Sequence, residues 1–134
     1  MILVDTSVWI DLFEGPPTSE SNELERLILA DGPVHSLPLI LLEVLQGIQE
    51  ESLYSAAREK LSVLRFLPVL DEDYLTAIEI SRACRKKGHS IRRGFDAVIA
   101  AVCMRYGFHL LHRDKDFEKI SRVAPLNIHH ARAH

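Results

Sequence analysis

Ile2-Leu3-Val4-Asp5-Thr6-Ser7-Val8-Trp9-Ile10 is the stretch that says most about the architecture of this 134-residue chain. Its apolar run ending at Val4 is typical of a short buried strand. The polar triplet Asp5-Thr6-Ser7 indicates a tight turn and the start of a helix, since such residues cap helix N-termini. Apolar residues then recur at helical spacing as far as Phe13. The stretch therefore predicts a strand, a turn and a helix, with a carboxylate placed where the strand ends.

Short apolar runs and amphipathic segments alternate along the rest of the chain. Strands are expected over 1–4, 34–36, 66–70, 108–111 and 126–128. Helices are expected from Ser7 to Gly15, from Ser19 or Ser21 to Asp31, and over 38–49, 52–64, 71–87, 94–106 and 114–122. This alternation predicts a single α/β domain over residues 1–134 with a mainly parallel central sheet. Sheets of this kind place their sites at the carboxyl ends of the strands.

The composition excludes several classes of protein. With 47% apolar and 26% charged residues, the chain is neither disordered nor fibrous. Its longest apolar stretches, 37–42 and 97–104, fall far short of the roughly 20 residues of a membrane span. The first residues lack the basic region of a signal peptide. Cys84 and Cys103 form no C-x-x-C pair, which suits a reducing cytoplasm, so we expect a cytoplasmic protein without membrane contact.

The charge is distributed unevenly along the chain. The net charge is −3, but residues 1–67 carry −7 and residues 68–134 carry +4. Half of the basic residues of the second part lie in one segment, 82–93, that contains no acid. Four of them are candidate contacts to RNA phosphates: Arg85, Lys86, Arg92 and Arg93. The alternative is a solvated helix end, because cations are favoured near a helix C-terminus.

Three apolar segments each carry a single charged residue, and in each it is an acid. These are Asp5 within 1–10, Glu43 within 37–48 and Asp96 within 94–104. At helical spacing, Glu43 and Asp96 share a face with apolar neighbours and so point toward packed sides of their helices. A buried ionised carboxylate needs a basic partner, a raised pKa or a metal ion. None of the three segments contains Lys or Arg, which excludes local pairing.

A fourth acid follows the expected strand 108–111, in His112-Arg113-Asp114-Lys115-Asp116-Phe117. Asp114 stands at a strand end, as Asp5 does, so both are expected along the same crevice, with Glu43 and Asp96 projecting from flanking helices. Four carboxylates in one crevice suggest a divalent cation. Ligation by oxygen alone favours Mg²⁺ or Mn²⁺ over zinc, and such ions activate water against a phosphodiester.

Each of these residues also has a structural interpretation. Asp5, Asp114 and Asp116 are ordinary N-cap residues, whereas a lone buried acid such as Glu43 or Asp96 rarely serves stability. Thr6 and Ser7 could orient Asp5 or a metal-bound water. The histidines, including His129, His130 and His134 in a polar tail, show no zinc-binding spacing, and Trp9 is expected in the core.

Four blocks of the sequence, taken together, resemble a PIN-domain ribonuclease of the VapC toxin type. They are the opening stretch 2–10, Leu42-Glu43-Val44-Leu45-Gln46-Gly47, Phe95-Asp96-Ala97-Val98-Ile99-Ala100-Ala101 and the segment 112–117. Their order and spacing match along nearly the whole chain. The resemblance implies a three-layer α/β/α fold, Mg²⁺- or Mn²⁺-dependent cleavage of RNA, a homodimer, and a cognate VapB-like antitoxin as inhibitor.

The same resemblance assigns roles to individual residues. The family's acidic quartet, which is both catalytic and metal-binding, corresponds by position to Asp5, Glu43, Asp96 and Asp114. Asp116 corresponds to a supporting acid. His112 is a departure, because many members have Thr or Ser before the fourth acid.

Two other functions fit an acidic α/β chain of this size. A phosphoacceptor receiver domain needs an adjacent acid pair after its first strand and a late strand-end lysine. Here Asp5 is followed by Thr6, and Lys115 lies between two acids, which disfavours this function. A catalytically inactive RNA-binding module of the same fold is the other alternative, and the complete quartet argues against it.

Overall fold

The computed structural model describes residues 1–131, so His134 and the end of the expected 1–134 domain lie outside the described part. Its strands are β1 (Ile2–Val4), β2 (Val34–Ser36), β3 (Arg65–Phe66), β4 (His109–Leu111) and β5 (Asn127–Ile128). Its helices are α1 (Thr6–Glu14), α2 (Ser19–Leu29), α3 (Pro38–Gln46), α4 (Glu51–Ser62), α5 (Asp71–Lys86), α6 (Gly94–Tyr106) and α7 (Lys115–Ser121). No helix within residues 1–131 is both long enough and apolar enough to cross a membrane.

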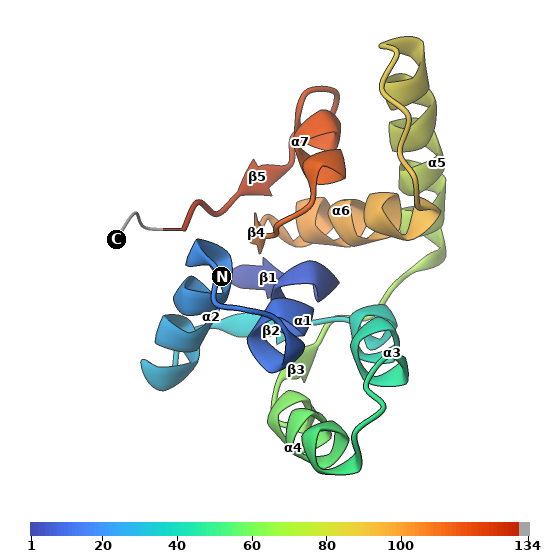
Figure 1. Cartoon of the computed structure of the whole chain (residues 1–134). Helices are drawn as coiled ribbons and strands as arrows, with labels where there is room; N and C mark the ends of the chain where they lie inside the picture. The colour runs from blue at the N-terminus through green and yellow to red at the C-terminus, as the bar shows by residue number, and fades with distance from the viewer. Residues whose placement is uncertain (132–134) are drawn as a thin grey trace.

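The five strands form one sheet in the order β3-β2-β1-β4-β5, and helices flank it (Figure 1). Every pairing among the described strands is parallel. The central strand β1 pairs with β2 on one side and β4 on the other, with Leu3 opposite His35 and Leu110. The predicted α/β architecture with a parallel central sheet is confirmed.

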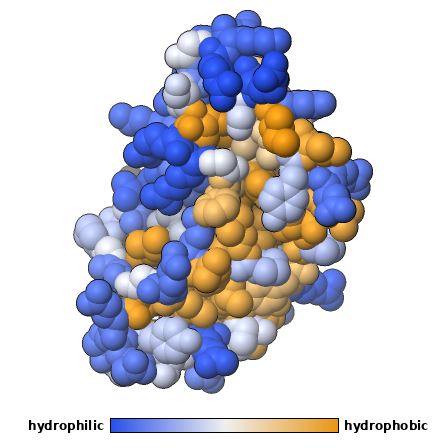
Figure 2. Space-filling model, turned by 90° about the vertical axis from the view of Figure 1, so that its right-hand side faces the viewer, coloured by the Kyte–Doolittle hydropathy of each residue, from blue (hydrophilic) through white to orange (hydrophobic). Residues whose placement is uncertain are grey.

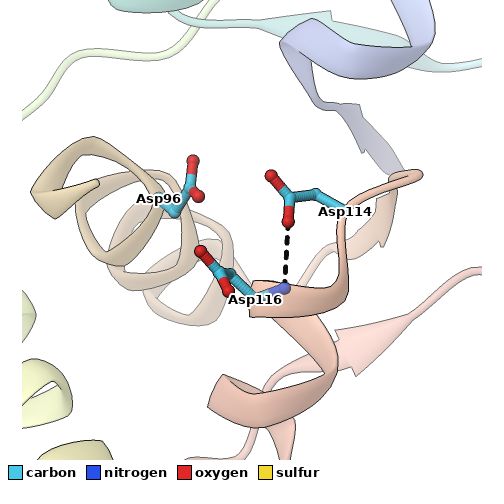
Figure 3. Close-up of side chains that lie close together, drawn as sticks. All are labelled: Asp96, Asp114 and Asp116. Carbon is cyan, nitrogen blue, oxygen red and sulfur yellow. Dashed lines mark hydrogen bonds between the residues drawn. The ribbon is translucent and has the colours of Figure 1, made fainter. Parts of the chain in front are cut away.

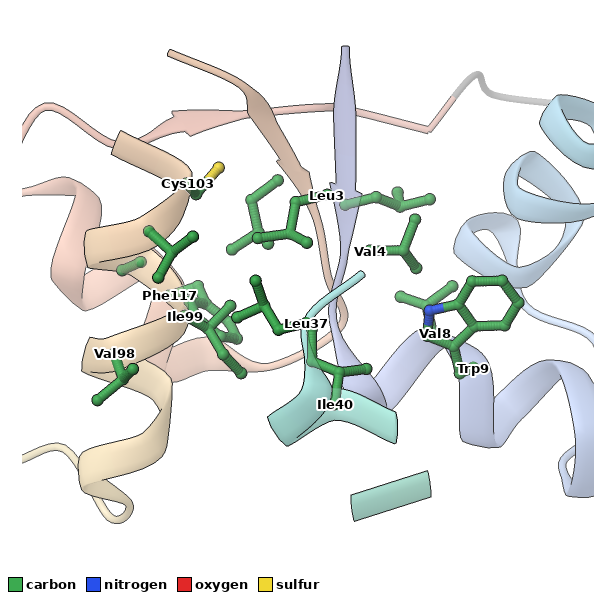
Figure 4. Packing of buried hydrophobic residues seen from close by; sticks show 14 of the residues in the cluster. Leu3, Val4, Val8, Trp9, Leu37, Ile40, Val98, Ile99, Cys103 and Phe117 are labelled. Carbon is green, nitrogen blue, oxygen red and sulfur yellow. The ribbon is translucent and has the colours of Figure 1, made fainter. Parts of the chain in front are cut away.

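The core lies on both sides of the sheet, because successive strand residues point to opposite faces. In Figure 4, Val8 and Trp9 of α1 pack on one side of the strands, and Ile99 and Cys103 of α6 pack on the other. The side chain of Trp9 is completely buried, as predicted. Cys84 and Cys103 are buried free thiols.

Some helix and strand boundaries differ from those predicted. Helix α3 ends at Gln46, three residues early, because the Glu50 carboxylate caps a new helix by accepting the backbone N–H groups of Ser52 and Leu53. The N-cap of α2 is Thr18, whereas Ser19 or Ser21 was predicted. The strand predicted over 66–70 is only β3, Arg65–Phe66, since Pro68 has no N–H for a ladder.

Candidate active site

The four predicted acids meet at the carboxyl edge of the sheet, where β1 and β4 end. A pocket of about 220 Å³ opens there. Its lining consists of Asp5, Thr6, Ser7, Ile10, Asp11, Glu43, Arg93, Asp96, Arg113 and Asp114. The parallel arrangement brings the strand ends together, and α3 and α6 supply the other two acids.

Asp5 is fixed by the turn between β1 and α1. Its backbone N–H donates to the carbonyl of Leu111 at 2.9 Å, which joins the ends of β1 and β4. Its carboxylate accepts the hydroxyl of Ser7 at 2.6 Å and the backbone N–H of Ser7 at 3.0 Å. The Ser7 hydroxyl in turn accepts the backbone N–H of Arg113 at 3.1 Å. Ser7 thus orients Asp5, as expected, and also holds the segment that leads to Asp114.

Glu43 is oriented by a neighbour on another helix. The hydroxyl of Thr6 donates to Oε1 of Glu43 at 2.9 Å, so the Thr6 side chain orients this acid, whereas the sequence suggested that it orients Asp5. Burial raises the pKa of Glu43 and the Asp5 charge raises it further, although the Thr6 hydrogen bond and Arg93 act in the opposite direction. An Arg93 nitrogen lies 3.8 Å from Oε2 of Glu43. Burial also raises the pKa of Asp5.

Asp96 lies in the first turn of α6, where the helix dipole favours a negative charge. Its residue is only 5% exposed, and its Oδ2 atom is buried without a hydrogen-bond partner among the described residues. Burial, followed by the nearby charges of Asp5, Asp114 and Asp116, raises the pKa of Asp96 to about 7. A buried polar atom without a partner is rare in folded proteins and costs stability.

Asp96, Asp114 and Asp116 form a compact acidic cluster, each offering an oxygen within 4.8 Å of the others. In Figure 3, Asp96 projects from α6 toward the two acids at the start of α7. Asp114 caps α7 by accepting the backbone N–H of Asp116 at 3.0 Å. The cluster therefore includes Asp116, to which the family resemblance gave only a supporting role.

Asp116 differs from the other acids because it is already neutralised. Its Oδ1 accepts from Nζ of Lys119 at 3.2 Å, and its Oδ2 accepts the backbone N–H of Arg92 at 3.1 Å. Burial acts to raise the pKa of Asp116, but these donors and their charges bring it below the ordinary value. Asp116 thus fastens the segment before α6 to α7.

His112 contacts Asp114 through its ring. Nδ1 accepts the backbone N–H of Asp114 at 3.1 Å, and the ring packs against Phe117. A ring nitrogen therefore holds the backbone of Asp114.

The four basic candidates fall into two groups. Arg92 and Arg93 stand at the acidic site, where Arg92 approaches Asp114 and Asp116. Arg85 and Lys86 are in the last turn of α5, and Arg85 lines a separate apolar hollow.

The ion pair between Arg113 and Asp11, at the wall of the pocket, was not predicted from the sequence. The guanidinium of Arg113 binds both carboxylate oxygens of Asp11, with Nη2 3.1 Å from Oδ1. The two residues are 102 positions apart, and no local pattern indicates such a pair. Their charges cancel at the wall of the pocket.

The donor set fits a divalent cation. Within residues 1–131, neither Asp5 nor Asp96 forms an ion pair, while Glu43 and Asp114 have only long contacts to arginines, of 3.8 and 3.3 Å. The pocket thus combines partly uncompensated negative charge with the unpartnered Oδ2 of Asp96. All these donors are oxygens, the ligands preferred by Mg²⁺ and Mn²⁺.

Comparison with known proteins gives the family of the chain. The family model described as "PIN domain" matches residues 2–123. Ribonuclease VapC11 of Mycobacterium tuberculosis is 32% identical over 128 residues, which cover 94% of this chain and 96% of the relative. The chain belongs to the PIN-domain family and to its VapC ribonucleases. The resemblance seen in the sequence is therefore confirmed.

Solved structures show the same PIN-domain fold. VapBC2 from Rickettsia felis, bound to a DNA fragment from its promoter, has a TM-score of 0.74 at 19% identity, covering 96% of this chain and 98% of the other. VapC20 of M. tuberculosis, described as a sarcin-ricin loop cleaving toxin, has a TM-score of 0.66 at 23% identity, covering 88% and 93%. At these identities the solved structures show that the fold is shared.

Proposed function

We propose that this PIN-domain protein is an Mg²⁺- or Mn²⁺-dependent endoribonuclease and the toxin of a toxin–antitoxin pair. The observation that carries the proposal is the state of Asp96, a buried acid with an unpartnered oxygen facing other carboxylates. Such an arrangement destabilises the metal-free fold, and a divalent cation would compensate it. It is therefore better explained by a ligand than by a structural role.

The acids that would hold the cation are Asp5, Glu43, Asp96 and Asp114. When bound, a divalent cation lowers the pKa of water and stabilises negative charge on a phosphodiester. The chain's own residues set the geometry: Ser7 orients Asp5, Thr6 orients Glu43, and His112 holds the backbone of Asp114. Because water and not the RNA 2′-hydroxyl is the nucleophile, products should carry a 5′-phosphate and a 3′-hydroxyl.

RNA contacts are proposed for Arg93 and Arg92 at the pocket, and for Arg85 and Lys86 at the end of α5. The side chains of Arg92 and Arg93 are 72% and 61% exposed, so both can reach a phosphate. The salt dependence of binding reports such contacts.

A homodimer and an antitoxin are the proposed protein partners. Figure 2 shows a broad hydrophobic area on the side of the molecule where α5 lies. Exposed apolar residues of α5 and α6 are Tyr74, Leu75, Ile78 and Phe95, and three of them, Tyr74, Ile78 and Phe95, line one apolar hollow. An area of this kind marks an interface, and we assign it to a second copy of the chain. VapBC complexes among the structural relatives support the proposal that this chain binds an antitoxin.

A cytoplasmic location is proposed as well. Both cysteines are free and buried, which suits a reducing compartment.

The direct test is an RNA cleavage assay with purified protein in Mg²⁺, Mn²⁺ or EDTA. Single-stranded or loop RNA should be cut only with metal, and end analysis should find 5′-phosphates. Products with 2′,3′-cyclic phosphate, or full activity in EDTA, would contradict the proposal. An Asp5→Asn variant with a parent-like melting curve controls for contaminating nuclease.

A further inference from the structure

We propose that Arg92 is a built-in counter-ion of the acidic site: a metal ion displaces its guanidinium from Asp114, and the freed guanidinium then binds a phosphate of the RNA. The inference rests on the proposed function, because it concerns the same site and substrate. It gives one side chain two successive partners, and the first of them is seen in the structure.

The first partner is the acidic cluster itself. Nη2 of Arg92 lies 3.3 Å from Oδ1 of Asp114, and Nε lies 3.5 Å from Oδ2 of Asp116. These two carboxylates and Asp96 make up the cluster whose oxygens lie within 4.8 Å of one another. A cation held by Asp96 and Asp114 and the guanidinium of Arg92 therefore compete for the negative charge of Asp114.

The guanidinium is held loosely enough to be displaced. Charge-assisted N–H···O contacts are typically about 2.7–2.9 Å long, and both contacts of Arg92 are longer. The Arg92 side chain is also 72% exposed. By contrast, Arg105 lies 2.8 and 2.9 Å from the oxygens of Asp73 and is 26% exposed, as expected of a structural pair.

Displacement would leave the backbone in place. The Arg92 N–H donates to Asp116 at 3.1 Å, and Lys119 Nζ lies 3.3 Å from the carbonyl of Ser90. Both contacts are independent of the guanidinium. Lys119 also stays 3.2 Å from Asp116, so this acid keeps a counter-charge after Arg92 leaves. The side chain can thus move while its segment stays anchored.

The second partner follows from the surroundings of Arg92. A hollow of about 360 Å³ next to the acidic pocket is lined by Arg92, Arg113, Asp114, Lys115, Asp116 and Lys119. Arg113 and Lys119 already bind acids. Of the two arginines that line this hollow, Arg92 is the one whose partner is also a proposed metal ligand, and its planar fork suits a phosphate.

The test compares Mn²⁺ binding by the parent, Arg92→Gln and Lys115→Gln, measured by calorimetry and by melting curves over a Mn²⁺ titration. Lys115→Gln is the matched control. The substitution removes the same charge next to Asp114, but Lys115 forms no ion pair among the described residues. Arg92→Gln should bind Mn²⁺ about threefold more tightly than the parent, and Lys115→Gln less than twofold more tightly. Equal effects of the two variants, or none for Arg92→Gln, would overturn the inference while the proposed function stands. A parent that binds no Mn²⁺ would overturn both.

The RNA step is tested by fluorescence anisotropy with a single-stranded RNA, in EDTA and in Ca²⁺, which also takes carboxylate ligands. One added phosphate contact steepens the salt dependence of binding by about 0.7 in the logarithmic slope. The parent should show this steepening in Ca²⁺ relative to EDTA, and Arg92→Gln should lose it. The same steepening in Arg92→Gln and the parent would contradict the transfer of Arg92 to the RNA.

Discussion

The Thr6 hydroxyl donates a hydrogen bond of 2.9 Å to Oε1 of Glu43, 37 positions along the chain, and so connects the start of α1 to α3. The bond holds Glu43 toward Asp5, although both are acids whose pKa is raised. A single hydroxyl therefore stabilises a pair of carboxylates that repel each other in the metal-free protein.

Thr6→Val should impair the site more than the fold. The change keeps the shape of the side chain but removes the donor, so the pKa of Glu43 should rise further and its carboxylate should lose its orientation. The lost hydrogen bond should lower the free energy of unfolding by only about 1 kcal/mol. RNA cleavage and Mn²⁺ affinity should fall together, and Thr6→Ser should restore both. A Thr6→Ser variant as inactive as Thr6→Val would show that the hydroxyl is not what matters.

Metal-free stability should decrease as pH rises between about 4 and 7. Asp96 has a folded-state pKa of about 7, above its ordinary value of 3.8, so the folded state binds an extra proton in this range. Raising the pH removes that advantage, which amounts to on the order of 4 kcal/mol, and the loss levels off above pH 7. Melting curves in EDTA at a series of pH values measure the effect, which is the difference in stability between the parent and Asp96→Asn. A difference that does not vary with pH would contradict the assigned pKa.

Asp73→Asn should lower the free energy of unfolding but leave RNA cleavage by the folded protein unchanged. Asp73 is buried on α5 and binds Arg105 of α6 through both oxygens, away from the acidic pocket. Breaking the pair should cost about 3 kcal/mol of unfolding free energy. Cleavage per folded molecule should stay at the parental level below the melting range. Glu79→Gln, an exposed acid on the same helix, is the control and should change neither quantity.

Arg93→Gln should flatten the salt dependence of RNA binding by about 0.7 in slope. Its guanidinium stands beside Glu43 and is exposed to solvent. Arg58→Gln, at an exposed position on α4, should leave the slope unchanged. The same measurement on Arg85→Gln and Lys86→Gln decides whether the end of α5 contacts RNA. Unchanged slopes would mean that these two residues are only solvated cations at a helix C-terminus.

The sequence was sufficient to predict the helices and strands and the meeting of the four acids at one edge of the sheet, because both depend on local patterns. An apolar run that ends in an acid, as at Val4-Asp5, places a carboxylate at a strand end, and parallel pairing brings such ends together. Arg113 with Asp11 and Arg92 with Asp114 could not be predicted, since they depend on how distant segments pack. The early end of α3 at Gln46 depended on the cap provided by Glu50, which resembles any other exposed glutamate in the sequence.

The most direct test of the acidic site is the Asp96→Asn variant, measured by thermal melts with and without Mn²⁺ beside an RNA cleavage assay. The substitution keeps the volume of the side chain and removes a buried charge that faces Asp5, Asp114 and Asp116. We expect cleavage to be lost, the metal-free melting temperature at pH 8 to hold or rise, and the stabilisation by Mn²⁺ to shrink. A large fall in the metal-free melting temperature with cleavage retained would contradict the account, because it would make Asp96 a structural acid and not a metal ligand.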